Sequence, residues 1–174
     1  MPALKKLVVI GPECTGKSTL SAALAAALHT RWVPEFAREY LDTCHHPYDE
    51  SDLLRIARGQ LKSEDSAAAG VHDFLVCDTD LYIIKVWSEA RFGRCERRIL
   101  QEIATRRYDL YLLTNIDVPW QFDPLREHPN ECDRRYFYHQ YRDIVQHSGL
   151  PWADIRGSAE QRLQSALAAI SSLP

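Results

Sequence analysis

Short apolar runs alternate with longer alanine-rich or amphipathic segments along this chain. Residues 7–10, with the sequence LVVI, form a continuous apolar run, which is typical of a strand buried on both faces of a parallel sheet. Residues 17–28 are rich in Ala and Leu and contain neither Pro nor Gly, so they predict a helix. Further apolar runs predict strands over residues 32–33, 74–77, 108–113 and 152–155.

The segments between these runs predict the other helices. Apolar side chains at i, i+3 and i+4 spacing predict a helix that starts at Ser51 or Asp52 and ends at about residue 69. Ser158 is the predicted cap of the final helix, because Glu160 and Gln161 follow in its first turn. The remaining predicted helices span residues 36–41, 81–92, 96–106 and 132–147.

This alternation of strands and helices predicts the fold class. It indicates a three-layer α/β/α fold, in which helices cover both faces of a parallel sheet of about five strands. The length of 174 residues suits a single domain over residues 1–174. In such folds ligands bind at the carboxyl ends of the strands, so the residues that follow each predicted strand are the candidates for function.

The segment after the first predicted strand carries the most specific motif in the chain. Residues 11–18 read GPECTGKS and match the phosphate-loop pattern G-x-x-x-x-G-K-[ST] between a strand and a helix. Backbone N–H groups of such a loop bind phosphate oxygens, the lysine reaches the β- and γ-phosphates, and the hydroxyl binds Mg²⁺. The alternative is a plain glycine turn. The predicted ATP-binding residues are Gly11, Glu13, Cys14, Thr15, Gly16, Lys17, Ser18 and Thr19.

The loop therefore predicts a P-loop NTPase with ATP and Mg²⁺ as cofactors, although the loop alone does not distinguish among NTPases. With a lid segment, described below, we expect the fold to be nucleotide-kinase-like. Asp78 ends the third predicted strand, where a P-loop protein carries its second acidic residue, and would hold Mg²⁺ together with Ser18. The alternative for Asp78 is a polar cap on the strand. Asp80 would aid the metal, bind a substrate hydroxyl or cap the helix that begins at Leu81.

Glu35 and Arg38 follow the second predicted strand. Phosphoryl transfer to an alcohol needs a group that accepts the hydroxyl proton, and Glu35 is the predicted base. Arg38 lies three residues later on the same helical face and would hold a phosphate or the substrate. The alternative is a surface ion pair between the two side chains, worth less than ~1 kcal/mol. With Lys17 and Arg126, these residues form the predicted catalytic set.

A polar, proline-containing stretch predicts a lid over residues 117–135, which we call the lid segment. Kinases need such a segment to exclude water from the transferred phosphoryl group. Arg126 is the predicted lid arginine that neutralises charge on that group. Arg134 and Arg135 either share this role or form the solvated face of a helix. Trp120 would act as a hinge, stack on a flat ring or pack against other side chains.

Composition and charge narrow the class of protein. The formal net charge of −3 offers no basic surplus for binding nucleic acid. We expect neither a membrane span, which needs ~20 apolar residues, nor a signal peptide, because the first apolar run leads straight into the phosphate loop. Five cysteines without a C-x-x-C pair predict reduced thiols in the cytoplasm rather than disulfides or zinc. His45 and His46 lack the further ligands that a metal site needs.

Several motifs together resemble those of a known family. They are the phosphate loop, E-x-x-R-E at residues 35–39, D-T-D at residues 78–80 and P-W-x-x-D-x-L-R at residues 119–126. This combination resembles the ribosylnicotinamide kinase domain of NadR-type proteins over most of the chain. The resemblance implies ATP-dependent 5′-phosphorylation of nicotinamide riboside, a nucleoside, to nicotinamide mononucleotide in NAD salvage. It also implies that Glu35 and Arg38 lie near the nucleoside, and that Asp78 and Arg126 are the metal-side acid and the lid arginine.

The chain departs from the family pattern at two places. NadR-type proteins carry an adenylyltransferase domain before the kinase, whereas Met1 lies close to the phosphate loop here. We therefore expect that activity to be absent from this chain, and a separate adenylyltransferase is a candidate partner. In the family, an aromatic residue that stacks on the nicotinamide ring precedes E-x-x-R-E, where this chain has Trp32 and Pro34. A cationic nicotinamide favours an aromatic or carboxylate wall, for which the candidates are Trp32, Trp87, Trp120 and Tyr40.

Two alternatives to a nicotinamide riboside kinase stay open on the sequence. One is a kinase of another nucleoside or small alcohol, which would differ in the pocket that binds the base. The other is a regulatory module that binds ATP without transferring phosphate. The sequence also leaves open the choice between ATP and GTP and whether the chain forms a homo-oligomer.

Overall fold

The computed structural model describes residues 4–174. Its elements follow one another as the apolar pattern predicts. In chain order they are β1 (Lys5–Ile10), α1 (Lys17–Ala27), β2 (Trp32–Val33), α2 (Phe36–Thr43), α3 (Glu50–Ala68), β3 (Phe74–Asp78), α4 (Leu81–Phe92), α5 (Arg97–Thr105), β4 (Leu110–Thr114), α6 (Glu131–His147), β5 (Trp152–Ile155) and α7 (Ala159–Ser171).

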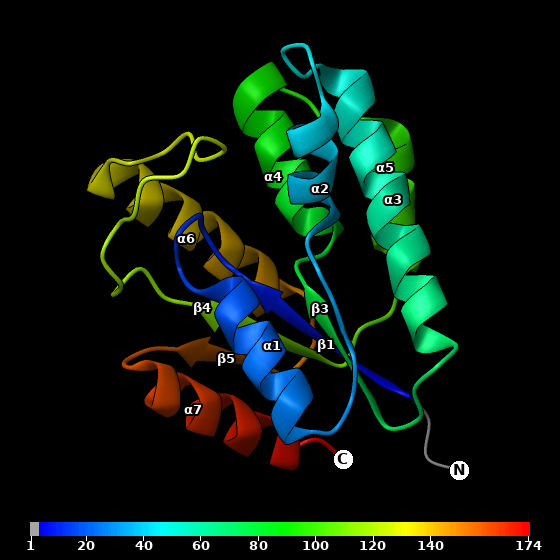
Figure 1. The fold of residues 1–174 in the computed structure, drawn as a ribbon, viewed down its shortest axis with the longest axis vertical. Helices are drawn as coiled ribbons and strands as arrows, with labels where there is room; N and C mark the ends of the chain where they lie inside the picture. Colours follow the sequence, from blue (N-terminus) through cyan, green and yellow to red (C-terminus); the bar gives the residue numbers. More distant parts are fainter. Residues whose placement is uncertain (1–3) are drawn as a thin grey trace.

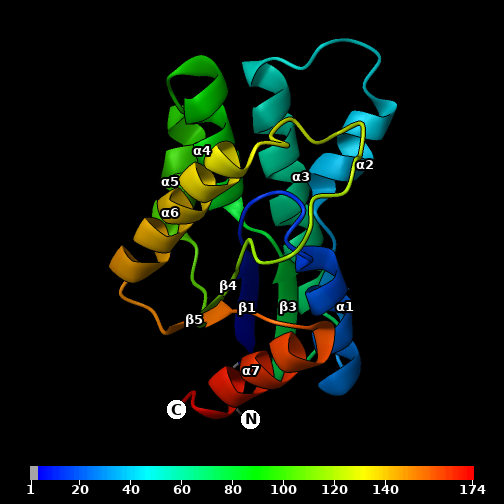
Figure 2. The same ribbon diagram turned by 90° about the vertical axis from the view of Figure 1, so that its left-hand side faces the viewer.

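All the strands are parallel and lie in the order β2-β3-β1-β4-β5. Helices α1 and α7 pack together on one face of the sheet, while α3, α4 and α6 cover the other (Figures 1 and 2). Helices α2 and α5 pack on this second layer through α3 and α4. The predicted three-layer α/β/α fold with a parallel sheet of about five strands is therefore confirmed.

The central strand β1 explains why its sequence is a continuous apolar run. Leu7 and Val9 pack into the core beneath α1 and α7, whereas Val8 and Ile10 pack into the core on the opposite face. All four side chains are fully buried. A strand enclosed on both faces has no solvent side on which a polar residue would be favourable, so the alternation seen in half-exposed strands disappears. The same enclosure fixes the position of the loop that follows Ile10.

Several element boundaries differ from the sequence prediction by one or two residues, including the starts of α3 and β4. Helix α3 begins at Glu50 rather than at Ser51 or Asp52, because Asp49 is its cap. The Asp49 carboxylate accepts the N–H groups of Ser51 and Asp52, and the Asp52 carboxylate accepts the N–H of Asp49 in return. Strand β4 begins at Leu110 rather than at residue 108.

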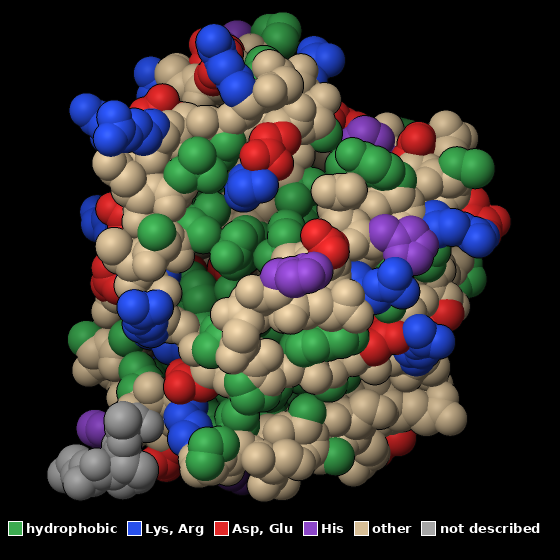
Figure 3. All heavy atoms as spheres, turned by 180° about the vertical axis from the view of Figure 1, so that it is seen from behind, with side chains coloured by type: hydrophobic (Ala, Val, Ile, Leu, Met, Phe, Trp, Pro, Cys, Tyr) green, Lys and Arg blue, Asp and Glu red, His purple; other side chains and the backbone are tan. Residues whose placement is uncertain are grey.

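The face opposite to that of Figure 1 is hollowed, and hydrophobic side chains gather along its middle (Figure 3). A cavity of about 380 Å³ lies among α4, α5, β4 and the connection from α6 to β5. It lies away from the phosphate loop and shares none of the lining residues of the larger cavity described below. Within residues 4–174, none of the helices is long and apolar enough to span a lipid bilayer.

The predicted cap of the final helix offers a stability test. The Ser158 hydroxyl accepts the N–H of Gln161, and the Gln161 side chain accepts the N–H of Ser158. We predict that Ser158→Ala lowers the free energy of unfolding by about 1 kcal/mol, because the backbone N–H of Gln161 in the first turn of α7 loses its hydrogen-bond acceptor. Ser165→Ala, at an exposed position inside the same helix, is the matched control and should change stability by less than ~0.5 kcal/mol. Urea denaturation of both variants measures the difference, and equal midpoints would contradict the capping assignment.

Candidate active site at the carboxyl ends of the strands

The phosphate loop joins β1 to α1 and is closed by contacts with the end of β4. Gly11 has a φ of +151°, and a Cβ atom there would lie 2.4 Å from the hydroxyl of Thr114, so only glycine fits. The Thr15 hydroxyl lies 2.6 Å from the Thr114 hydroxyl and donates to the carbonyl of Pro12 at 2.8 Å. The Lys17 ammonium donates to the same Pro12 carbonyl at 2.9 Å, which holds it across the loop.

Two buried arginines fix the loop from outside its own sequence. Arg162 on α7 donates to the carbonyl of Thr15 at 2.9 Å and forms an ion pair with Asp117. Arg134 on α6 donates to the carbonyl of Cys14 at 3.3 Å. Because these guanidinium groups bind consecutive stretches of the loop backbone, they hold it in one conformation before any phosphate arrives.

These contacts decide between the two interpretations of the lid arginines. Arg134 is 6% exposed, so it is no part of a solvated helix face. Arg135 does lie on that face, where it forms an ion pair with Glu131. The sequence analysis missed Arg162, since a single arginine in an amphipathic helix gives no signal of its contact with a loop far away in the chain.

Asp78 lies at the end of β3, next to the start of α1. Its side chain is fully buried, and neither of its carboxylate oxygens has a hydrogen-bond partner among the described residues. Burial raises the pKa of Asp78 to about 6, although Lys17 and Ser18 act in the opposite direction. A buried, unpartnered carboxylate beside a lysine and a hydroxyl fits the donor set that Mg²⁺ takes in P-loop proteins.

Asp80 caps α4. Its carboxylate accepts the N–H of Tyr82 at 3.0 Å and the phenol of Tyr111 at 2.8 Å. Burial raises its pKa to about 7, because the group lies in the core of the molecule. Of the three roles that the sequence allowed for Asp80, the structure shows the helix cap.

Glu35 and Arg38 lie at the start of α2, and both line the same cavity as Lys17. The alternative of an ion pair between them is wrong, because Arg38 instead pairs with Asp123 of the lid segment at 2.9 Å. Glu35 forms no ion pair within residues 4–174. The peptide after Glu35 is held by Gln60, whose side-chain oxygen accepts the N–H of Phe36 at 2.9 Å.

The lid segment arches over the phosphate loop (Figure 2). The carboxylate of Glu13 accepts the N–H groups of Glu127 and His128 at 3.0 and 3.1 Å. Arg126 donates to the sulfur of Cys14 at 3.2 Å, so the predicted lid arginine reaches the loop. Residues 115–130 form no helix or strand, and these polar contacts are what hold the segment in place.

A single cavity of about 480 Å³ brings the predicted site residues together. Its lining includes all the predicted loop residues together with Glu35, Arg38 and Arg126. Asp78 is the one predicted site residue that does not line the cavity, because its side chain is fully buried. The cavity therefore runs from the phosphate loop along α2 to α4 and beneath the lid segment.

The end of the cavity away from the loop is aromatic. The rings of Tyr48 and Trp87 meet edge to face with centroids 4.8 Å apart, and the Trp87 indole N–H donates to the Tyr48 phenol at 3.0 Å. That phenol in turn donates to the Glu127 carboxylate at 2.9 Å. The result is a wall of two rings with a carboxylate beside it, built from α4, the connection from α2 to α3 and the lid segment.

Only Trp87 among the four aromatic candidates lines this cavity. Trp32 packs against the core between the sheet and α1, and the Tyr40 phenol donates to Asp52 at 2.6 Å. Trp120 lies outside this lining, and the guanidinium groups of Arg126 and Arg134 lie 5.7 and 5.9 Å from its ring centre. Tyr48 was missed, because nothing in the local sequence marks a tyrosine in a connection as part of a pocket.

Comparison with family models matches residues 6–162 to a family described as an AAA domain (AAA_28). The chain belongs to this family. Its phosphate loop, Glu35 after β2 and Asp78 at the end of β3 all lie inside the matched region. The cysteines of this member are all free thiols.

Individual relatives and structures resemble the chain over nearly its whole length. The trifunctional NAD biosynthesis/regulator protein NadR of Salmonella typhimurium is 26% identical over 158 residues, which are 88% of this chain and 38% of that protein. A crystal structure of NadR protein in complex with NR has a TM-score of 0.72 at 21% identity, covering 97% of this chain and 51% of that one. Thymidylate kinase from Ehrlichia chaffeensis has a TM-score of 0.70 at 12% identity, covering 97% and 100%. The chain thus spans 38% of the length of the curated relative, and the solved structures share its fold.

The buried carboxyl group of Asp78 predicts a gain of stability when it is removed. Above a pH of about 6 the wild-type group is ionised while buried and without a hydrogen-bond partner among residues 4–174, whereas in the unfolded chain it ionises in water. Asp78→Asn should therefore stabilise the ligand-free protein at pH 7.5 by about 1–3 kcal/mol. The gain should shrink as the pH falls from about 6 toward 3.8, because the wild-type group is then increasingly protonated in the folded protein.

Urea denaturation at pH 7.5 and 4.5, without nucleotide or magnesium, measures this difference. Equal stability of wild type and Asp78→Asn at pH 7.5 would show that the carboxylate carries no penalty in the folded protein.

Proposed function

We propose that this chain is an ATP-dependent kinase that phosphorylates a nucleoside, with nicotinamide riboside as the acceptor. The observation that carries the proposal is the continuity of one cavity, which joins the phosphate loop to a pocket of aromatic rings past Glu35. A donor phosphate at one end and a flat ring at the other would place a ribose hydroxyl between them. The likeness to NadR proteins, one of them solved with NR, supports this choice of acceptor.

The loop end of the cavity suits ATP. Backbone N–H groups of the loop and the N-terminus of α1 would bind the phosphates, with the Lys17 ammonium on the β- and γ-oxygens. Ser18 and Asp78 would hold Mg²⁺, which supplies positive charge to the phosphate oxygens when bound. The lid segment would exclude water, and Arg126 would stabilise negative charge on the transferred group.

Glu35 is the proposed base. It lies at the carboxyl end of β2, lines the cavity and forms no ion pair with the described residues, which leaves its carboxylate available to accept the proton of the attacking hydroxyl. Arg38 is tied to the lid segment through Asp123. It would therefore connect lid closure with the position of the acceptor, in addition to binding its phosphate or hydroxyl groups.

The aromatic end suits a cationic ring. Tyr48 and Trp87 would contact the nicotinamide, and the nearby Glu127 carboxylate would favour its positive charge. These residues take the place of the aromatic side chain that the family carries where this chain has Pro34. A neutral base would gain binding free energy from contact with the rings but not from the charge of the carboxylate.

We also propose that residues 1–174 form one kinase domain with a lid over residues 117–135. ATP and reduced thiols are typical of the cytoplasm, where we place the protein. Conversion of the nucleotide product to a dinucleotide would need an adenylyltransferase outside the residues described.

The first experiment measures ADP release from ATP·Mg²⁺ with nicotinamide riboside and then with a panel of nucleosides, with the product identified by mass. Nicotinamide mononucleotide is the expected product. Phosphorylation of a different nucleoside would keep the kinase and replace the acceptor. Nucleotide binding without transfer to any acceptor would favour the regulatory module.

We predict that Glu35→Gln lowers turnover by about 10²–10⁴-fold with ATP binding retained, because the amide cannot accept the hydroxyl proton. Glu39→Gln is the matched control, since Glu39 lies exposed on the same helix and outside the cavity lining. It should change turnover by less than ~2-fold. Similar turnover in both variants would show that Glu35 is not the base.

A further inference from the structure

We propose that Cys44 is a reactive thiol, activated by His46 and Asp52, and that small hydroperoxides oxidise it at the wall of the cavity. Cys44 is the residue after α2, His46 lies in the connection to α3, and Asp52 is in the first turn of α3. None of these side chains has a part in the proposed phosphoryl transfer. Only the effect of oxidation on the acceptor rests on the proposed function, whereas the reactivity of the thiol does not.

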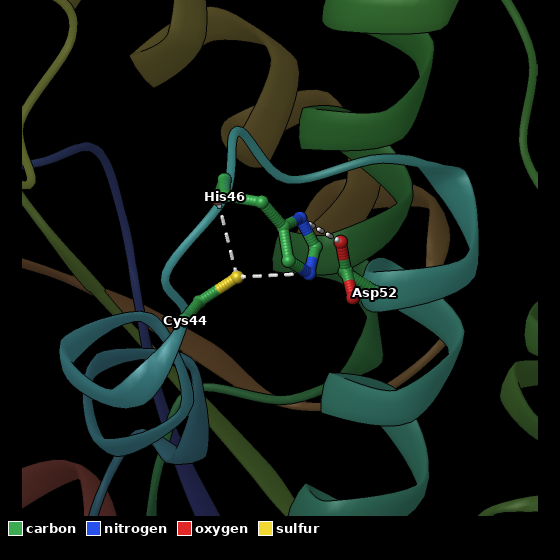
Figure 4. Close-up of side chains that lie close together, drawn as sticks. All are labelled: Cys44, His46 and Asp52. Atoms are coloured by element: carbon green, nitrogen blue, oxygen red, sulfur yellow. Dashed lines mark hydrogen bonds and ion pairs between the residues drawn. The ribbon is translucent and has the colours of Figure 1, made fainter.

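The imidazole of His46 lies between the thiol and the carboxylate (Figure 4). The Cys44 sulfur is 3.6 Å from Nε2 of His46, and Nδ1 of the same ring is 3.8 Å from the Asp52 carboxylate. The Cys44 thiol also donates a hydrogen bond to the carbonyl oxygen of His46 at 3.3 Å. A thiol, an imidazole and a carboxylate in this order form the arrangement that generates thiolate nucleophiles in proteins.

The second nitrogen of the ring fixes the direction of proton transfer. Nδ1 lies 2.9 Å from the carbonyl oxygen of Pro47, which can only accept a hydrogen bond, so the neutral ring carries its proton on Nδ1. Nε2 is then the nitrogen with a free lone pair, and it faces the thiol. Transfer of the thiol proton to Nε2 yields a thiolate beside an imidazolium.

Asp52 is a fixed negative charge behind this ring. Its carboxylate is fully buried and accepts the phenol of Tyr40 at 2.6 Å, the guanidinium of Arg55 at 2.8 Å and the N–H of Asp49 at 2.9 Å. The hydrogen bond from Tyr40 is the largest of several causes that hold the pKa of Asp52 below its ordinary value. The carboxylate is therefore ionised at neutral pH, and it faces the Nδ1 side of the His46 ring.

The same geometry argues against a metal ion at these residues. The thiol and the carboxylate face different nitrogens of the ring, and one ion binds an imidazole through only one of them. The donors from Tyr40, Arg55 and Asp49 already occupy the carboxylate oxygens. The residues thus fit a proton relay better than a coordination sphere.

A small reagent can reach the thiol. Cys44 is half-buried, and both Cys44 and His46 line the 480 Å³ cavity next to Tyr48. The reaction is a displacement at the peroxide: the thiolate attacks one oxygen, an S–O bond forms and the O–O bond breaks. The sulfur is oxidised to sulfenic acid, and the departing hydroxide takes a proton to give water when the reagent is hydrogen peroxide. The added oxygen would then project into the proposed acceptor pocket.

The test is trapping of sulfenic acid with dimedone after brief exposure of the folded protein to hydrogen peroxide, with labelling followed by mass at each cysteine. Cys132 is the internal reference, because it is exposed and has no hydrogen bond to its sulfur among the described residues. We expect Cys44 to be labelled about tenfold faster than Cys132 at pH 7, since an ordinary thiol is only a few per cent ionised there. Cys14 also lines the cavity, so its peptide is followed separately.

Two variants assign the effect to the relay. His46→Gln should reduce labelling of Cys44 to the level of Cys132 or below, whereas His45→Gln, which changes a neighbouring exposed histidine, should leave it unchanged. In urea-unfolded wild type the labelling rates of Cys44 and Cys132 should agree within about twofold, since the arrangement is then lost. Labelling of Cys44 no faster than Cys132 in the folded protein, or unaffected by His46→Gln, would overturn the proposal. None of these measurements depends on kinase turnover. Their outcome is therefore independent of whether the proposed function is correct.

Discussion

The fixed backbone of the phosphate loop is the constraint on which the rest of the site depends. The loop begins where the fully enclosed strand β1 ends, and Gly11 fits against Thr114 only because it lacks a side chain. Arg134 and Arg162 reach it from α6 and α7 and bind its carbonyl groups. A phosphate that enters the loop therefore meets donors that are already in position, and little free energy is lost in ordering them.

The same loop also contacts Asp78 and the lid segment. Ser18 and Lys17 bring a hydroxyl and an ammonium to Asp78, whose carboxylate has no hydrogen-bond partner in the part of the chain that the structure describes. Glu13 and Cys14 bind the lid segment through its backbone and through Arg126. The site thus combines a rigid floor with a cover held by a few exposed polar contacts, which is the combination that substrate entry and water exclusion require.

Sequence reasoning located the parts of the site that local patterns encode. The phosphate loop, Asp78 at the end of an apolar strand and Glu35 after a short one are all read from neighbouring residues, and the structure brings Glu35 and the loop to one cavity. Arg162 and Tyr48 could not be predicted from the sequence, because their roles depend on contacts with residues far away in the chain. The predicted start of α3 was one or two residues too late, since Asp49, Ser51 and Asp52 are all residue types that start helices and only the reciprocal hydrogen bonds distinguish them.

In the proposed enzyme, one cavity holds a nucleotide at the loop and a cationic nucleoside at the aromatic end at the same time. Titration of nicotinamide riboside into protein saturated with a non-hydrolysable ATP analogue and Mg²⁺, followed by calorimetry, tests it most directly. We predict binding of one riboside per chain without loss of the bound nucleotide. Displacement of the nucleotide by the riboside, or no binding of the riboside in the presence or absence of nucleotide, would contradict it.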